Sequence, residues 1–219
     1  LDQLKSGVEK GKQFPFRYWS AFAAIKSASI NHEQLVCDSL EECMDLAVAN
    51  MPKLEGRVMS LCDNSGSAWG TLNSEYGSVK VAEIANLSAL ITGIQAEEGH
   101  VGVFGDNLKT RSVSKRNGLL TQLRESNTIG QGIGGGTENG IWMFWDKAIK
   151  NKEHWDTVFI YSDMQAGHGG LYGVNAREYK DFIHPNKGGS YIDVLALVRK
   201  YRQTVNPKVN VFSVQVAGY

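Results

Sequence analysis

Three oxygen-bearing side chains stand at alternate positions in one short stretch of the sequence. Asp63, Ser65 and Ser67 follow directly after an apolar run, Val58 to Cys62, and Gly66 lies between the two serines. A carboxylate and two hydroxyls supply the hard oxygen ligands that a divalent cation such as Mg²⁺ takes in proteins. Gly66 lets the chain turn tightly enough to aim the three side chains inward. The spacing therefore predicts a cation site at the end of a buried strand.

Two further oxygen donors follow other predicted elements. Thr137 ends a glycine-rich loop, residues 130–136, and Asp163 follows a predicted strand, Val158 to Tyr161. Ligands of open α/β sheets bind at the carboxyl ends of the strands, so we expect these loops and the loop after Cys62 to converge. Two carboxylates and three hydroxyls, without His or Cys, suit Mg²⁺ or Mn²⁺ and do not suit structural Zn²⁺.

The elements that must position these donors begin with a helical segment. Pro15 is well placed as the first residue of one helix. Asn31 is the candidate cap of the next, whose apolar residues recur every three or four positions until Pro52 ends it. No strand pattern appears in this part of the chain. We therefore expect residues 1–55 to be the end of an all-helical region and residues 56–219 to be a separate domain.

From Arg57 onward, predicted strands alternate with predicted helices. The expected strands span residues 58–62, 100–105, 108–114, 157–161 and 209–216. The expected helices span residues 79–94 and 118–126, the stretch from a cap at Thr137 through Ile149, and residues 191–201. Such alternation predicts an α/β fold, a doubly wound and mostly parallel sheet with helices on both faces.

Composition limits the class of protein. The 219 residues are 42% apolar and 21% charged, as in an ordinary globular protein, and the formal net charge of zero provides no global field toward nucleic acid or a membrane. No apolar run is long enough for a transmembrane helix, so no membrane partner is expected. Three cysteines without a C-x-x-C pair favour a reducing compartment, and we expect a cytoplasmic location. Because the chain begins without Met or a signal-peptide layout, we expect a fragment of a longer protein.

The donors Asp63-x-Ser65-x-Ser67, then Thr137, then Asp163, resemble the metal-ion-dependent adhesion site of the von Willebrand factor A domain. The resemblance implies that Ser65 and Ser67 bind Mg²⁺ or Mn²⁺ directly and that Thr137 binds directly or through water. It implies that Asp63 and Asp163 often act through water. It also implies an open coordination position that accepts an acidic group from a protein or another ligand.

The amino-terminal segment of residues 11–17, Gly-Lys-Gln-Phe-Pro-Phe-Arg, resembles the helical repeats of TROVE-module proteins, the Ro autoantigen family. Those proteins join a ring of helical repeats to a von Willebrand A domain and bind small noncoding and defective RNAs. The resemblance implies RNA as a partner of the parent protein, mostly through a ring that this chain largely lacks. The sequence departs from the adhesion-site family at Ala68-Trp69, where Met is usual.

The function expected from these residues is metal-dependent ligand binding within a Ro-like, RNA-binding ribonucleoprotein scaffold. The sequence offers no nucleophile–base pair, so we do not expect an enzyme. Two alternatives stay open. One is a general protein-interaction von Willebrand A module without a role in RNA binding, and the other is a metal-dependent phosphohydrolase with Asp63 as its nucleophile.

Two other features of the sequence could be taken for phosphate-binding sites, but each has a simpler interpretation. The glycine-rich loop lacks the Gly-Lys-Ser/Thr ending of a phosphate cradle, so we interpret its glycines as allowing Thr137 to approach the ion. A basic cluster could contact a phosphate backbone, although a solvated edge strand is the favoured interpretation. This cluster comprises Lys109, Arg111, Lys115, Arg116 and Arg124.

Overall fold

The computed structural model describes residues 2–28, 30–74, 77–136, 139–163, 168–170, 178–185 and 191–216. The α-helices are α1 (Asp2–Gly11), α2 (Pro15–Ala28), α3 (Glu33–Ala49), α4 (Val81–Gln95), α5 (Leu119–Gln131), α6 (Gly140–Lys150) and α7 (Val194–Thr204). The strands are β1 (Leu54–Asp63), β2 (Thr71–Ser74), β3 (Gly77–Lys80), β4 (Ala96–Phe104), β5 (Leu108–Ser112), β6 (Thr157–Ser162), β7 (His168–Gly170), β8 (Tyr191–Asp193) and β9 (Asn210–Gln215). Two short 3-10 helices are η1 (Ser67–Trp69) and η2 (Lys180–Phe182).

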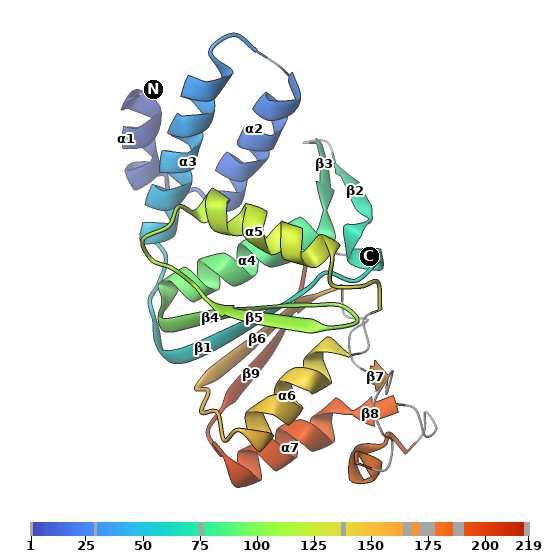
Figure 1. Cartoon of the computed structure of the whole chain (residues 1–219). Helices are drawn as coiled ribbons and strands as arrows, with labels where there is room; N and C mark the ends of the chain where they lie inside the picture. The colour runs from blue at the N-terminus through green and yellow to red at the C-terminus, as the bar shows by residue number, and fades with distance from the viewer. Residues whose placement is uncertain are drawn as a thin grey trace.

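Five of these strands form the main sheet, in the order β5-β4-β1-β6-β9. β1 pairs in parallel with β4 and β6, β6 pairs in parallel with β9, and β5 alone runs antiparallel at one edge. Helices α4 and α5 lie on one side of this sheet and α6 and α7 on the other (Figure 1). The predicted fold class, a doubly wound and mostly parallel α/β sheet flanked by helices, is confirmed.

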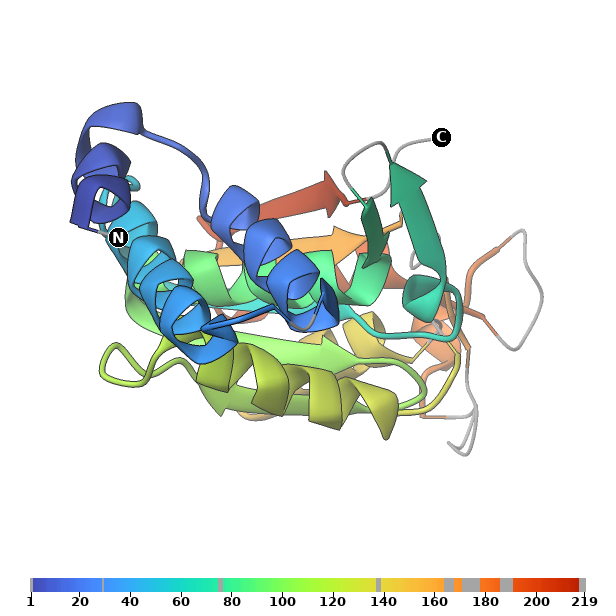
Figure 2. The ribbon, with the colours of Figure 1, turned by 90° about the horizontal axis from the view of Figure 1, so that it is seen from above.

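The hydrophobic core has two main layers, one on each face of the sheet. On the α6–α7 side, Phe144 and Trp145 pack with Leu197 and Tyr201. On the α4–α5 side, the apolar residues of α4 and α5 share one cluster with residues of α1, α2 and α3, including the fully buried Met44. Figure 2 shows these amino-terminal helices lying over that side, with the β2–β3 hairpin near the carboxyl ends of the parallel strands. The boundary between residues 55 and 56 stays a prediction.

The start of α3 and the start of α7 differ from the predictions. Asn31 does not cap α3: the helix begins after His32, which takes a left-handed backbone conformation with φ 60° and makes no side-chain cap hydrogen bond. The predicted helix of residues 191–201 begins later, because Tyr191–Asp193 pairs with residues 168–170 as strand β8. Asp193 then caps α7 by accepting a hydrogen bond from the Ala196 backbone N–H at 3.1 Å.

The glycine-rich stretch is shorter as a loop than predicted. Helix α5 continues through Gly130 and Gln131, so only residues 132–136 of the predicted loop follow it. The residue that precedes α6 is Asn139, whereas the predicted cap, Thr137, lies outside the described residues. The sequence patterns also missed two short two-stranded sheets, β2–β3 and β7–β8. None of the described helices is long and apolar enough to cross a membrane.

Candidate metal centre

Four of the five predicted donors meet at the carboxyl ends of two neighbouring strands. Asp63 is the last residue of β1, and Asp163 directly follows β6. The Ser65 and Ser67 hydroxyl oxygens lie 3.2 Å apart, and Ser67 Oγ donates to Asp163 Oδ2 at 3.2 Å. The predicted convergence therefore holds for these four residues. The fifth predicted donor, Thr137, lies outside the described residues.

Asp63 is fully buried, and hydrogen bonds hold both of its carboxylate oxygens. Oδ1 accepts from the Ser65 backbone N–H at 2.9 Å, and Oδ2 accepts from Ser162 Oγ at 2.9 Å. Ser162 Oγ also lies 3.4 Å from Asp163 Oδ1, so one hydroxyl stands between the two carboxylates. Ser162 is a further member of this cluster that the sequence patterns do not single out. Its only signal is its place at the end of a predicted strand, next to Asp163.

The electrostatics of this cluster disfavour an ionised Asp63 without a cation. Burial is the main cause that raises the pKa of the Asp63 carboxyl above its ordinary value, and the nearby Asp163 charge raises it further. Hydrogen bonds from Ser65 and Ser162 act in the opposite direction. A bound cation would favour the charged carboxylate, since an opposite charge within a few ångströms stabilises it.

The residues present fit a hard divalent cation. Two carboxylates that are 0% and 7% exposed, Asp63 and Asp163, stand with two serine hydroxyls in one connected cluster. Within the part of the chain that the structure describes, no group of three or more His, Cys, Asp or Glu side chains gathers at one point. A cation here would therefore depend on neutral hydroxyl oxygens as well as on the two carboxylates, as Mg²⁺ sites permit.

The glycine-rich loop runs beside the serine loop. The Gly66 backbone N–H donates to the Gly135 carbonyl at 2.8 Å, which joins the two loops directly. The Gly136 N–H donates to Asp106 Oδ1 at 2.9 Å. Gly134 has φ 97°, and a Cβ there would overlap the Asp106 carboxylate, so glycine is required at this close approach. The loop is thus held against the donor cluster as far as residue 136.

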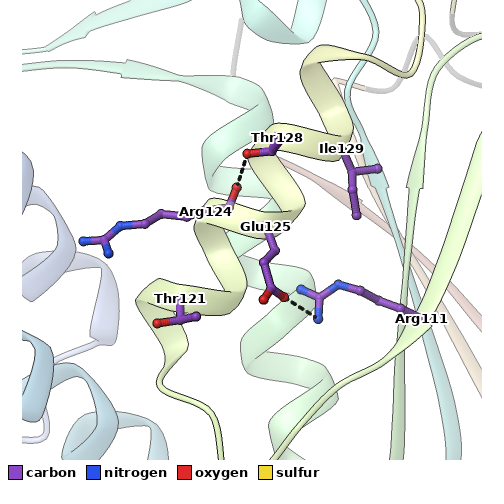
Figure 3. Close-up of a pocket in the computed structure, with 6 residues that line it drawn as sticks. All are labelled: Arg111, Thr121, Arg124, Glu125, Thr128 and Ile129. Carbon is purple, nitrogen blue, oxygen red and sulfur yellow. Dashed lines mark hydrogen bonds and ion pairs between the residues drawn. The ribbon is translucent and has the colours of Figure 1, made fainter.

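Two members of the basic cluster, Arg111 and Arg124, do not converge on one point. Arg111 Nη2 donates to the Gln122 carbonyl and to Ser126 Oγ, each at 2.9 Å, and Arg111 also pairs with Glu125 at 3.5 Å. Figure 3 shows the guanidinium group of Arg111 reaching Glu125 and that of Arg124 lying well apart from it, among the residues that line a pocket of about 510 Å³. Arg111 lies on the edge strand β5, and residues of α5 already occupy its guanidinium group. This geometry favours a solvated edge strand over a site that binds a phosphate backbone.

Comparison with known proteins gives a likeness of fold. No protein-family model matches this sequence, and no curated protein sequence matches it. Among solved structures, the crystal structure of the Ro (RSR) protein of Deinococcus radiodurans is similar, with a TM-score of 0.63 and 14% sequence identity. The match covers 96% of this chain and 39% of that protein, so this chain spans about two fifths of its length. One Ro protein thus matches the helices and the sheet together.

Proposed function

We propose that this chain is the metal-dependent ligand-binding part of a Ro-like scaffold protein. The observation that carries the proposal is the connected cluster of Asp63, Ser65, Ser67 and Asp163 at the carboxyl ends of β1 and β6. Thr137 would complete the donor set. The ion, Mg²⁺ or Mn²⁺, would offer an open coordination position to an acidic group of a partner.

The protein's own residues would shape this site in three ways. Ser65 and Ser67 present hydroxyl oxygens from a loop whose ends are fixed by β1 and by η1. Asp63 supplies charge from a buried position, where its attraction to a cation is weakly screened. Ser162 keeps the two carboxylates in place with its single hydroxyl. Affinity would arise from charge neutralisation in a partly dry setting, and specificity from the surrounding loops.

Binding without catalysis is the activity that this geometry supports best. A phosphohydrolase would need the Asp63 carboxylate to attack a substrate phosphorus atom. Asp63 is fully buried and both of its oxygens accept hydrogen bonds, which counts against that alternative. We propose a cytoplasmic parent protein whose RNA contacts lie mostly in helical repeats outside this chain. The likeness in fold to a Ro protein supports this reading over a general interaction module.

Calorimetric titration with Mn²⁺ and with Mg²⁺ tests the metal site. The native chain should bind either ion, and the double variant Asp63→Ala with Ser65→Ala should lose binding while circular dichroism shows a folded protein. A matched control removes an exposed carboxylate and an exposed hydroxyl elsewhere, Asp38→Ala with Ser213→Ala, and should bind like the native chain. Equal binding in the two double variants would refute the proposed site.

The scaffold role is tested on the full-length parent protein. A gel-shift assay with misfolded small RNA should show a complex if the Ro-like proposal is right, and no complex would favour the general interaction module.

Turnover of a generic phosphoester that disappears in Asp63→Asn would instead support the phosphohydrolase.

A further inference from the structure

Asn64 stands between two donors, Asp63 and Ser65, and its side chain joins the loop to the helices behind it. The residue is 1% exposed. Asn64 Nδ2 donates to Asn86 Oδ1 of α4 at 2.7 Å, and Asn86 Nδ2 donates back to Asn64 Oδ1 at 2.9 Å. Asn86 Nδ2 also donates to Asn127 Oδ1 of α5 at 2.8 Å. Three side-chain amides thus connect the donor loop to two helices.

The remaining polar groups of Asn64 are also engaged. Its backbone N–H donates to the Phe104 carbonyl at 2.8 Å, and its side-chain Nδ2 donates to the Cys62 carbonyl at 3.1 Å. The Asn64 carbonyl accepts from Trp69 Nε1 at 3.1 Å. Buried networks in which every member has a partner rigidify the structure around them. The backbone that carries the donors on either side of Asn64 is therefore fixed by this residue.

The carboxyl-terminal end of α5 packs directly against the side-chain amide of Asn64. A Cβ added at Gly130 would overlap Asn64 Oδ1, whereas a Cβ at Gly132, two residues on, would meet no atom closer than 3.8 Å. The chain that follows α5 is the glycine-rich loop, which accepts the Gly66 N–H through the Gly135 carbonyl. The end of α5 thus contacts the donor loop at Asn64 and, through the following loop, at Gly66.

We infer that Asn64, Asn86, Asn127 and Gly130 are positioning residues that set the donor loop and couple cation binding to the end of α5. The coupling half of this inference rests on the proposed function. Residues that orient metal ligands without touching the metal commonly change affinity strongly when replaced. Coupling between two sites is reciprocal, so a bound cation must in turn stabilise the end of α5 in this position.

Two glycine substitutions two residues apart test the inference. Gly130→Ala should weaken Mn²⁺ binding by roughly tenfold or more, the usual size of such effects, because its Cβ displaces the Asn64 amide. The matched control Gly132→Ala should bind Mn²⁺ like the native chain, since its Cβ would make only ordinary van der Waals contacts. Alanine favours a helix more than glycine does, so loss of α5 does not explain weaker binding in the first variant. Equal affinities in the two variants would overturn the inference.

Hydrogen exchange without metal gives a second readout, independent of binding. The amides of Asn64 and Gly66 should exchange faster in Gly130→Ala than in the native chain, and at the native rate in Gly132→Ala. Asn127→Ala, which removes the outermost amide of the network, should show a smaller increase in the same two amides. Native exchange rates in Gly130→Ala would refute the positioning role.

The same measurement with Mn²⁺ separates this inference from the proposed function. In the native chain, Mn²⁺ should slow exchange of the α5 amides from Ile129 to Gln131. If the native chain binds no Mn²⁺, the proposed function and the coupling fail together, whereas the metal-free exchange rates still decide whether the asparagine network positions the loop. Binding of Mn²⁺ without any change at the end of α5 would overturn the coupling alone.

Discussion

Acidic side chains lie beside both ends of β1, but their surroundings at the two ends are opposite. At the amino end, Glu98 of the neighbouring strand is exposed and pairs with Arg57 at 2.7 Å and with His100 at 2.9 Å. At the carboxyl end, Asp63 and Asp163 are buried beside serine hydroxyls. The carboxylate at one end therefore meets the Arg57 guanidinium and the His100 ring, while at the other end the carboxylates meet hydroxyls and each other.

The pKa values of the two carboxyl groups differ accordingly. The hydrogen bond from His100, followed by the Arg57 charge, lowers the pKa of Glu98. Burial raises the pKa of Asp63. At the amino end, side chains of the protein itself stabilise the charged Glu98 carboxylate. At the carboxyl end, the charged form of Asp63 is disfavoured, and a bound cation would stabilise it. The contrast teaches that burial together with neighbouring hydroxyls, and not the number of acidic residues, distinguishes a candidate ion site here.

Among the variants considered, Asp63→Asn should have the largest effect, on the stabilisation of the protein by a bound cation. The amide keeps the size of the carboxylate and removes its charge, so Mg²⁺ and Mn²⁺ should no longer raise the stability of the protein. A cation at one hundred times its dissociation constant stabilises a native protein by about 2.7 kcal/mol, and this increment should disappear. Thermal unfolding with and without Mn²⁺ measures it. An undiminished increment in the variant would place the cation elsewhere.

A second effect concerns the amino end. The Arg57 guanidinium lies 4.1 Å from the centre of the Trp155 ring as well as beside Glu98. Arg57→Ala should lower the free energy of unfolding by about 1–2 kcal/mol through lost packing and the lost cation–π contact. Mn²⁺ affinity should not change, because six residues of strand place Arg57 roughly 20 Å from Asp63. Urea unfolding checks the stability and calorimetry checks the affinity.

Arg57→Lys is the matched control for that prediction. Lysine keeps the charge beside Glu98 but loses the flat face that lies on Trp155. If stacking dominates, the lysine variant should be nearly as unstable as the alanine variant. A lysine variant with native stability would show that the ion pair, and not the ring contact, stabilises this end.

Much of this molecule follows from its sequence because the decisive signals are local. The apolar run before Asp63 predicted the central strand, and the stripe from Ile141 to Ile149 predicted α6, because each pattern reports which face is buried. The closeness of Asp63, Ser65 and Asp163 was predictable for the same reason. They follow strand ends, and strand ends in a parallel sheet meet at one edge.

What the sequence patterns missed depends on contacts between distant parts of the chain. Ser162 became recognisable only once β6 lay beside β1. Asn86 and Asn127 look like ordinary helix residues, and only packing brings their amides to Asn64. Gly130 has a low helix propensity and was assigned to a loop, although α5 continues through it where it passes Asn64. Local propensity carries no information about such neighbours.

The pH dependence of the metal-free protein sharpens the contrast at Asp63. A carboxyl whose pKa is higher in the folded state stabilises the fold at low pH, and that contribution is lost as the pH rises through the folded-state pKa. The native chain should therefore gain stability relative to Asp63→Asn as the pH falls from neutral toward 4. Urea unfolding in a chelating buffer at several pH values measures the difference. A constant difference would mean that burial does not raise the pKa of this carboxyl.

The smallest effect is expected at Glu98, and its sign is opposite. A carboxyl whose pKa is lower in the folded state stabilises the fold above its unfolded-state pKa, and that contribution is lost as the pH falls through the lowered value. Glu98→Gln should cost at most about 1 kcal/mol at neutral pH, since ion pairs at exposed positions contribute little. As the pH falls, the native chain and Glu98→Gln should converge in stability, whereas at Asp63 acid favours the native chain. If the Glu98 and Asp63 variants changed in the same direction, burial would not be what distinguishes the two ends of β1.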